Sequence, residues 1–429
     1  MTIVIGIPGV QGPPGETGSP GEAGTNGTNG TNGTNGAQGA QGVPGANAKW
    51  QTGQSYTGLV ATRAKVPTNG GFSQNTAHMA RTIHVARTNI TQIGAAFANW
   101  YCNGTAEVAA GAACTITASV EYPLGGAITR LTFGGSNSGT AYDFSTLASD
   151  LVTLAIPAGA QFAIREFRQC ATNGSVCFTG FTGDSSIGPD VTAGDCFVYT
   201  SATDLTGATG SFTSTDSSSY APPIAVFGPT TVPSYALFGD SRVEGYQDTP
   251  NGNLYVGELA RSVGPVRAFT NLAKFGETLA AVVGTGFTQR AAVAAKYCTH
   301  IICNYGVNDL FTGASAPTVL KNLAALRQQF PAQYFYQTTI DPETTSTDSW
   351  ATTTNQTLVS SADETQRQRV NNTLRSKIVC FDGVFDTSSV METGINTGIW
   401  KAPGYTIDGV HGTALSYGDI ASSGVIAVQ

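Results

Sequence analysis

The chain has 429 residues, which exceeds a typical single domain and predicts two or three structural units. Only 11% of its residues are charged and the formal net charge is −7, which excludes a basic nucleic-acid surface or a polybasic membrane anchor. An apolar run long enough to span a membrane is absent, and the first residues lack the basic start and apolar core of a signal peptide. We therefore expect no nucleic-acid partner, no membrane insertion, a neutral or sugar-like partner, and release from a cell by a route such as lysis.

Glycine occupies every third position from Gly6 to Gly45, which gives 14 consecutive triplets. This is the collagen pattern, because only glycine fits at the crowded axis of three polyproline-II strands. A single chain of this composition does not fold alone, so the repeat predicts a collagen-like stalk over residues 1–46 and a homotrimer joined through it. A flexible glycine-rich linker is the alternative interpretation.

The middle of the chain has the pattern of an all-β structure. Residues 47–81 are polar and mixed, and we interpret them as a neck or linker. Residues 82–230 contain short runs of β-branched and aromatic residues, several alternating with period two, separated by Gly, Asn, Ser and Pro. This spacing predicts a β-sandwich of the jelly-roll type. Trp100 or Tyr101 could bind sugar, but aromatic residues in alternating strands are usually buried, and we favour the core.

Eight cysteines occur without any Cys-x-x-Cys pair, which argues against a zinc ribbon or a thioredoxin-type centre. Cys102 with Cys114, or Cys170 with Cys177, could join across a turn of small residues; buried free thiols are the alternative. Cys298 and Cys303 are expected to share a strand at an odd separation, so their side chains should face opposite ways and not bond.

Residues 231–429 change to short apolar strands that alternate with helix-like segments. The strands are expected at 235–238, 297–304, 333–338 and 378–381, and the helices at 278–283, 288–296, 319–329 and 364–375. Such alternation predicts an α/β domain with a parallel sheet covered on both faces. Ligands of such sheets bind beyond the carboxyl ends of the strands.

Two short segments at that expected edge carry groups suited to nucleophilic catalysis. The apolar run before Gly239-Asp240-Ser241 breaks at the glycine, and a turn there would lift the Ser241 hydroxyl off the sheet. Asp408 and His411 are three residues apart, a spacing at which a carboxylate can orient an imidazole base. Ordinary turn chemistry for Asp-Ser, and a turn or cap role for Asp408, are the alternatives.

Together with Asn271–Gly276 and Tyr305–Asp309, these segments resemble the four blocks of the SGNH (GDSL) hydrolases. The blocks carry Ser, Gly, Asn and His in that order, which fall here on Ser241, Gly276, Asn308 and His411. The resemblance covers roughly the last two hundred residues. It implies a three-layer SGNH-type domain with catalytic Ser241, His411 and Asp408.

The same resemblance implies an oxyanion hole formed by the backbone N–H groups of Ser241 and Gly276 and the side-chain amide of Asn308. Arg242 stands where the commonest first block has Leu, a difference expected to affect substrate fit. Asp309 is expected to cap the helix after Asn308.

The remaining titratable residues favour no other chemistry. The four histidines lack zinc-ligand spacing, and His300 lies in an apolar strand where a core position is expected. The sequence also shows no pair of carboxylates of the kind that would indicate a glycosidase. We therefore expect acyl transfer to water without a metal or a cofactor.

The whole layout resembles a bacteriophage fibre or tail-associated esterase, and its β-sandwich before an SGNH domain resembles certain carbohydrate esterases. This resemblance implies a serine esterase that removes O-acetyl or other small acyl groups from a host surface polysaccharide. It would be displayed on a trimeric virion fibre and bound to other virion proteins through its N-terminus. One alternative is a receptor-binding fibre whose SGNH domain recognises glycan with little or no activity; another is a bacterial surface or spore-coat protein. The presence of Ser241, Asn308, Asp408 and His411 favours the esterase over the binding fibre.

Overall fold

The computed structural model describes residues 48–71, 75–180, 188–200, 202–249, 252, 254–284, 287–377 and 380–429. The chain divides into two units, Met1–Val43 and Pro44–Gln429, and the structure below is that of the second. The collagen-like stalk predicted for residues 1–46 lies outside the described residues.

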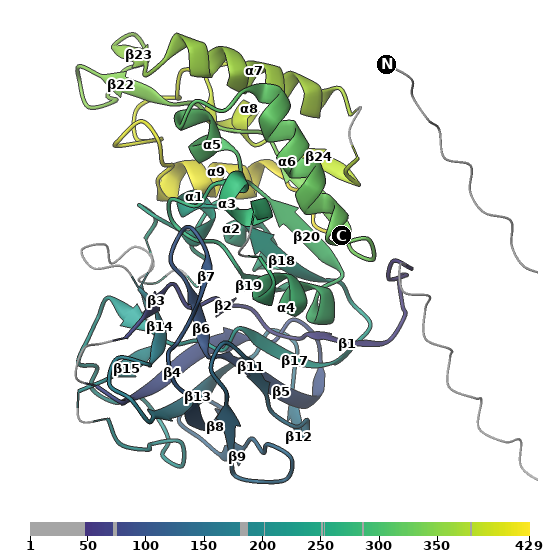
Figure 1. The fold of residues 1–429 in the computed structure, drawn as a ribbon, viewed down its shortest axis with the longest axis vertical. Helices are drawn as coiled ribbons and strands as arrows, with labels where there is room; N and C mark the ends of the chain where they lie inside the picture. Colours follow the sequence, from purple (N-terminus) through teal and green to yellow (C-terminus); the bar gives the residue numbers. More distant parts are fainter. Residues whose placement is uncertain are drawn as a thin grey trace, which may run out of the picture. The chain divides into compact units, whose positions relative to one another are not determined.

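Two antiparallel sheets form the β region of this unit (Figure 1). The first has the order β1-β17-β5-β11, with β12 also on β5, and comprises Tyr56–Leu59, Ala225–Thr230, Ile90–Ala98, Thr146–Ala148 and Val152–Ile156. The second has the order β10-β8-β13-β4-β15, with β9 on β8, and comprises Ser138–Ala141, Cys114–Glu121, Gln161–Cys170, Ala77–Val85, Cys196–Val198 and Ile128–Arg130. One apolar cluster unites Ile93 and Phe97 of β5 with Ile116 of β8 and Phe162 of β13. The two sheets therefore share a core, and a β-sandwich of jelly-roll type stays a prediction.

Smaller strands complete the β region. β3 (Asn69–Gly70), β14 (Cys177–Gly180) and β16 (Ser219–Tyr220) form one small sheet. β6 (Trp100–Cys102) and β7 (Glu107–Ala109) form a hairpin. Trp100 is fully buried, as expected, and its indole N–H donates to Thr146 Oγ1; Tyr101 is half-buried.

The described residues of the segment interpreted as a neck, residues 47–81, belong to both the β region and the α/β region instead. β1 joins the first β-sheet, and β2 (Ala64–Lys65) joins the parallel sheet of the α/β region. β4 begins at Ala77, so the β region starts before residue 82. The physical reason is burial: Leu59, Val60 and Val66 are at most 1% exposed, although polar neighbours obscured them in the sequence.

The α/β region contains a six-stranded sheet of order β2-β19-β18-β20-β21-β24, in which all pairs are parallel. Its other strands are β19 (Ala268–Asn271), β18 (Ser234–Phe238), β20 (His300–Cys303), β21 (Tyr334–Thr338) and β24 (Gly383–Phe385). The helices are α2 (Ala260–Val263), α3 (Leu279–Gly284), α4 (Gln289–Tyr297), α5 (Val307–Phe311), α6 (Ala316–Gln328), α7 (Ser361–Arg375), α8 (Ser388–Met391) and α9 (Ala414–Ser423).

The helices cover both faces of this sheet, as the alternating pattern predicted (Figure 1). Ala236 and Phe238 of β18 pack in a cluster with residues of α3 to α7, while Tyr235 and Leu237 pack in a cluster with residues of α2, α8 and α9. Successive side chains of a strand point to opposite faces, so one short apolar strand supplies both cores.

The expected elements of the α/β region mostly lie where the pattern placed them. The exception is the last strand, which was expected at 378–381 and is observed at Gly383–Phe385; residues 378 and 379 lie outside the described residues. His300 is fully buried against Tyr334 and Tyr336, as expected, and burial lowers the pKa of its imidazole to about 4.

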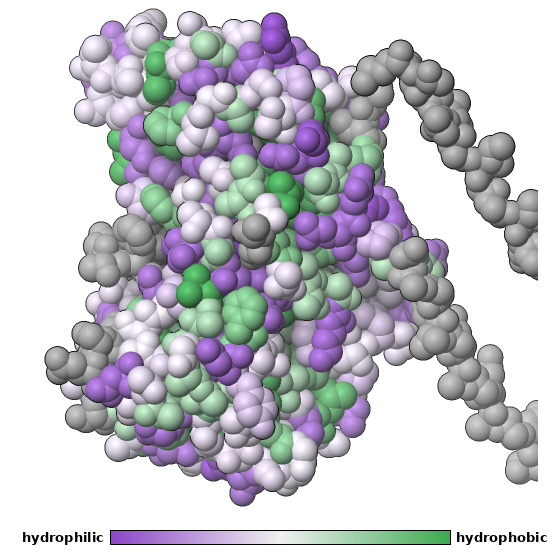
Figure 2. Space-filling view, viewed as in Figure 1, coloured by the Kyte–Doolittle hydropathy of each residue, from purple (hydrophilic) through white to green (hydrophobic). Residues whose placement is uncertain are grey.

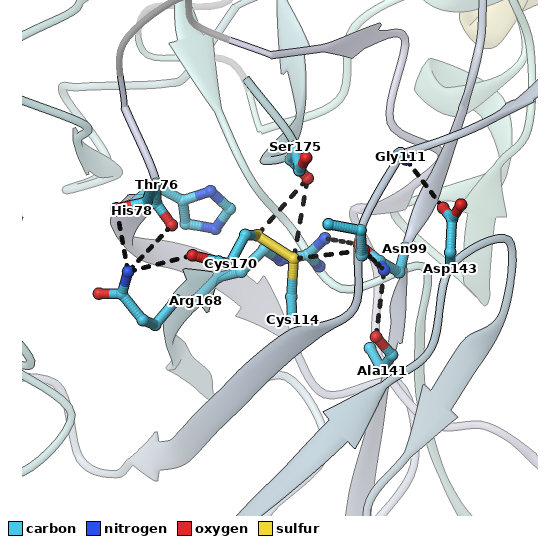
Figure 3. The surroundings of a disulfide bond; sticks show 12 residues. Thr76, His78, Asn99, Gly111, Cys114, Ala141, Asp143, Arg168, Cys170 and Ser175 are labelled. Atoms are coloured by element: carbon cyan, nitrogen blue, oxygen red, sulfur yellow. Dashed lines mark hydrogen bonds between the residues drawn. A yellow bond between two sulfur atoms is a disulfide. The ribbon is translucent and has the colours of Figure 1, made fainter. Parts of the chain in front are cut away.

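A disulfide joins Cys114 of β8 to Cys170 of β13, so neither cysteine pair considered from the sequence is the bonded one (Figure 3). The two residues lie directly opposite each other in the antiparallel register, with their Cα atoms 4.1 Å apart. Cys102 and Cys177 are buried free thiols, as are Cys298 and Cys303. The bonded pair is fixed by strand pairing between residues 56 positions apart, which local turn patterns could not predict.

On the face shown in Figure 2, hydrophobic and hydrophilic residues are interspersed. Within the described ranges, no helix combines the length and the apolar character needed to cross a membrane.

Candidate active site

The turn after β18 presents Ser241 at the sheet edge. Gly239 is required there, because a Cβ at this position would lie 2.4 Å from Val243 Cγ2. Asp240 then caps the short helix α1 (Ser241–Glu244), and its Oδ1 accepts a hydrogen bond from the Arg242 backbone N–H at 3.1 Å. Ser241 is thus the first residue of α1 and is 5% exposed.

Ser241, His411 and Asp408 form one hydrogen-bonded chain. Ser241 Oγ lies 2.7 Å from His411 Nε2, and His411 Nδ1 lies 2.7 Å from Asp408 Oδ2. The other carboxylate oxygen, Asp408 Oδ1, accepts from the backbone N–H groups of Val410 and His411 at 2.8 and 2.9 Å. The serine and histidine are 170 positions apart, so the tertiary fold alone brings them together.

The Asp408 carboxyl group is held in its ionised form. Partial burial alone would raise its pKa, but the hydrogen bonds and charge of His411 and the backbone N–H donors lower it to about 2. Gln247 adds a further donor, with its Nε2 2.7 Å from Asp408 Oδ2. No pattern in the sequence singled out Gln247, since its contact depends on a loop with a positive φ of 62°.

The segment that carries Asp408 and His411 is fixed by close packing at Gly409. This residue has φ +78°, and a Cβ on it would lie 1.9 Å from the Thr344 carbonyl oxygen. Its own carbonyl accepts from Thr344 N–H and Trp400 Nε1, both at 3.0 Å. Thr344 begins the hairpin β22 (Thr344–Ser346) and β23 (Gln356–Leu358), which therefore supports the histidine segment.

Arg242, which was expected to affect substrate fit, contacts the same segment. Its side chain is 1% exposed, and its Nε donates to the Val410 carbonyl at 2.9 Å. A guanidinium Nη1 lies 3.9 Å from buried Asp341. The guanidinium is enclosed between Asp341 and the Val410 carbonyl. We therefore infer that Arg242 holds the histidine segment, which carries Asp408 and His411, in place.

Asn308 and Gly276 meet at one short segment. Gly276 follows β19, is exposed and has φ +73°. Asn308 lies in α5, and its Nδ2 donates to the carbonyl of Glu277 at 3.0 Å. The structure therefore brings the third sequence block into contact with the residue that directly follows the second.

Asp309 has a different role from the expected one. It lies inside α5, and its two carboxylate oxygens accept from the backbone N–H groups of Leu279 and Ala280 at 2.7 and 3.1 Å. It therefore caps α3, the helix that follows Gly276.

Two aromatic side chains that the sequence reasoning missed flank the imidazole of His411. Tyr246 meets it edge-on with ring centroids 4.6 Å apart, and Phe275 lies nearly parallel to it at 6.1 Å. Both are half-buried. Phe275 belongs to the second block and directly precedes Gly276. Its position next to that glycine was the feature of the sequence that could have indicated it.

No group of three or more His, Cys, Asp or Glu side chains suited to hold a metal ion occurs in the described part of the chain. The chemistry that the arrangement can perform on its own is proton transfer from a hydroxyl to an oriented imidazole.

Two family models match the chain. Residues 4–54 match the collagen triple helix repeat, and residues 235–422 match the GDSL-like lipase/acylhydrolase family. No curated protein matches the chain significantly.

Among solved structures, the chain is similar to a carbohydrate acetylesterase from Sinorhizobium meliloti, with 14% identity over 45% of this chain and 97% of that one and a TM-score of 0.32. A GDSL-like lipase from Bacteroides thetaiotaomicron has 13% identity over 44% and 84% of the two chains, with a TM-score of 0.31. A lipolytic G-D-S-L protein from Veillonella parvula has 17% identity over 45% and 97%, with a TM-score of 0.32.

The residues matched by the second family model include Ser241, Gly276, Asn308, Asp408 and His411. The chain therefore carries collagen triple helix repeats in its N-terminal part and a GDSL-type (SGNH) lipase/acylhydrolase domain in its C-terminal part.

Proposed function

We propose that the protein is a serine esterase in which Ser241 is the nucleophile, His411 the general base and Asp408 the group that orients the imidazole. The observation that carries this proposal is the continuous chain of hydrogen bonds from Ser241 Oγ through His411 to Asp408. As Oγ attacks an ester carbonyl, Nε2 takes its proton, and the ionised Asp408 stabilises the imidazolium that forms. His411 then protonates the leaving alcohol, and water hydrolyses the acyl-enzyme in the second half-reaction.

The developing oxyanion would be bound by the backbone N–H groups of Ser241 and Gly276 and by Asn308 Nδ2. The contact between Asn308 and Glu277 supports this assignment, because it places the amide at the residue after Gly276. An amide side chain is suited to the role, since it donates at every working pH.

Asn308→Ala is expected to lower kcat by on the order of 10²-fold with little change in KM, because one oxyanion donor typically contributes about 3 kcal/mol in the transition state alone. Steady-state hydrolysis of p-nitrophenyl acetate measures both constants. Thr312→Ala, one turn further on and exposed, is the control. Equal kcat values for parent and Asn308→Ala would exclude this role.

We further propose that the substrate is an O-acetylated, or otherwise acylated, polysaccharide on a host cell surface, and that the enzyme is displayed on a trimeric virion fibre. The low charge of the chain supports a substrate that is not a polyanion. The half-buried rings of Tyr246 and Phe275 beside His411 suit a sugar, whose apolar faces stack on aromatic rings. The collagen repeats support three chains, for which light scattering should give three times the mass of one chain.

Acetate release from polysaccharide tests the substrate proposal. The full-length protein is incubated with O-acetylated capsule or O-antigen preparations, and bound and free acetate are followed by ¹H NMR. We expect the bound signal to fall and free acetate to rise only with the parent protein, while Ser241→Ala leaves the polymer unchanged. Hydrolysis of p-nitrophenyl acetate without release from any polymer would reject the polysaccharide as substrate.

A receptor-binding fibre with an inactive hydrolase domain is the alternative. It predicts retention of the polysaccharide by the parent protein and by Ser241→Ala alike, without acetate release. The intact Ser241–His411–Asp408 arrangement favours the esterase, because binding alone requires no such proton-transfer geometry.

A further inference from the structure

The β6–β7 hairpin of the β region contacts the segment Phe275–Glu277, which we call the oxyanion segment. At the hairpin turn, a Cβ added to Gly104 would lie 3.3 Å from the Phe275 carbonyl oxygen. The hairpin therefore approaches Gly276 from a part of the chain that precedes the hydrolase domain by more than a hundred residues, and Figure 1 shows it beside the elements of the α/β region.

Glu107, the first residue of β7, connects the hairpin to helix α4 of the α/β region. Its Oε2 accepts from the backbone N–H groups of Thr288 and Gln289 at 3.0 and 2.6 Å, so it caps α4. Its Oε1 accepts from Arg290 N–H at 2.9 Å and from Arg290 Nε at 3.1 Å. Each side chain of the Glu107–Arg290 pair is 1% exposed, so water competes little with this contact.

Arg290, which Glu107 holds in place, in turn binds the oxyanion segment. Its Nη1 and Nη2 each donate to Glu277 at 2.7 Å in a bidentate pair, and Tyr305 Oη donates to the same carboxylate. The carbonyl of Glu277 accepts from Asn308 Nδ2. A continuous path of buried polar contacts thus runs from Glu107 through Arg290 and Glu277 to the amide assigned to the oxyanion hole.

The oxyanion segment is also held from its other end, by the helix that carries the nucleophile. Glu244 of α1 accepts from Phe275 N–H at 2.5 Å, and its backbone carbonyl accepts from Lys65 Nζ of β2 at 3.2 Å. Gly276 has no side chain and a φ of +73°, so nothing of its own fixes the direction of its N–H. Its neighbours on both sides must supply that rigidity.

We propose that Glu107 is a positioning residue for the oxyanion hole. Through it, the β region contributes to esterase activity. The bidentate Arg290 cannot hold Glu277 in one place unless its own position is fixed, and Glu107 fixes it from the hairpin. Without that anchor Glu277 and the Asn308 amide that it orients gain freedom. A small displacement of an oxyanion donor weakens transition-state binding far more than substrate binding. This inference rests on the proposed esterase function.

The test compares two isosteric changes of buried carboxylates in the full chain. Glu107→Gln keeps an oxygen that can cap α4 but removes the charge that holds Arg290. Glu121→Gln is the matched control, because Glu121 is also buried in a β-strand and also pairs with arginines, Arg81 and Arg165. Each variant is assayed for kcat and KM with p-nitrophenyl acetate, for inhibition by phenylboronic acid and for its Tm.

Phenylboronic acid forms a tetrahedral adduct with a reactive serine and so reports on the oxyanion hole. We expect Glu107→Gln to lower kcat at least about tenfold and to leave KM within about twofold. Inhibition by phenylboronic acid should weaken by the same factor as kcat/KM falls. Glu121→Gln is expected to keep kcat and inhibition by phenylboronic acid within about twofold of the parent. This should hold even if its Tm falls as far as that of Glu107→Gln.

Tyr305→Phe provides a second variant if Glu107→Gln does not fold. It removes one hydrogen bond to Glu277 without a change of charge and is expected to show the same pattern with a smaller loss. The proposal is overturned if the variant that folds keeps the kcat of the parent, or if the Glu121 control loses kcat equally. A parent protein without esterase activity would overturn both the proposed function and this inference, whereas an active parent with an equally active Glu107→Gln would overturn the inference alone.

Discussion

Replacing Ser241 with alanine is expected to lower kcat/KM for p-nitrophenyl acetate by on the order of 10⁴-fold or more, because the acyl-enzyme can no longer form. The Ser241 hydroxyl lies 2.7 Å from His411 Nε2, within hydrogen-bonding distance of its base. The side chain is small and at the end of a turn, so its loss should leave Tm nearly unchanged. Initial rates at several substrate concentrations, with Tm measured on the same sample, give the result.

Ser422→Ala, on the exposed part of α9, is the control for a change of serine to alanine in the same domain. It should retain the full rate. A Ser241→Ala protein that hydrolyses the ester as fast as the parent would show that the hydrogen-bonded chain at the sheet edge is not used, and the esterase proposal would then fail.

The largest effect on stability is expected for Arg367→Ala. Arg367 in α7 is 3% exposed and binds two buried carboxylates: its Nε and Nη2 donate to Glu364, and its Nη1 donates to Glu392 at 2.7 Å. It also donates to the Ile340 carbonyl at 2.7 Å. Removing the cation leaves both buried carboxylates without a positive charge beside them, which typically costs about 3–5 kcal/mol.

Urea unfolding of Arg367→Ala, followed by circular dichroism, measures this loss as a change in the free energy of unfolding. Arg375→Ala is the matched control on the same helix, because its pair with Asp386 is more exposed and should contribute about 1 kcal/mol or less. Similar losses in the two variants would show that burial does not set the strength of the Arg367 contacts.

The catalytic candidates could be found in the sequence because each depends on a short local pattern. A buried strand followed by Gly239 predicts a turn that lifts the Ser241 hydroxyl off the sheet, and the spacing of Asp408 and His411 predicts that the carboxylate orients the imidazole. Of the elements after residue 231, three strands and four helices likewise followed from apolar periodicity, which reflects burial at each position in turn, whereas the last strand was misplaced. The collagen repeats could be recognised from glycine at every third position, because the triple helix has room only for glycine at its axis.

Tertiary structure alone decided the contacts between residues whose separation in sequence is large. It paired Cys114 with Cys170 through strand register, brought the Arg242 side chain to the Val410 carbonyl, and made Asp309 the cap of α3. It also placed the strand Ala64–Lys65 in the sheet of the hydrolase domain and Glu107 at the N-terminus of α4. A local pattern records whether a side chain is buried, but not which distant group it meets, because that depends on how the completed sheets and helices pack.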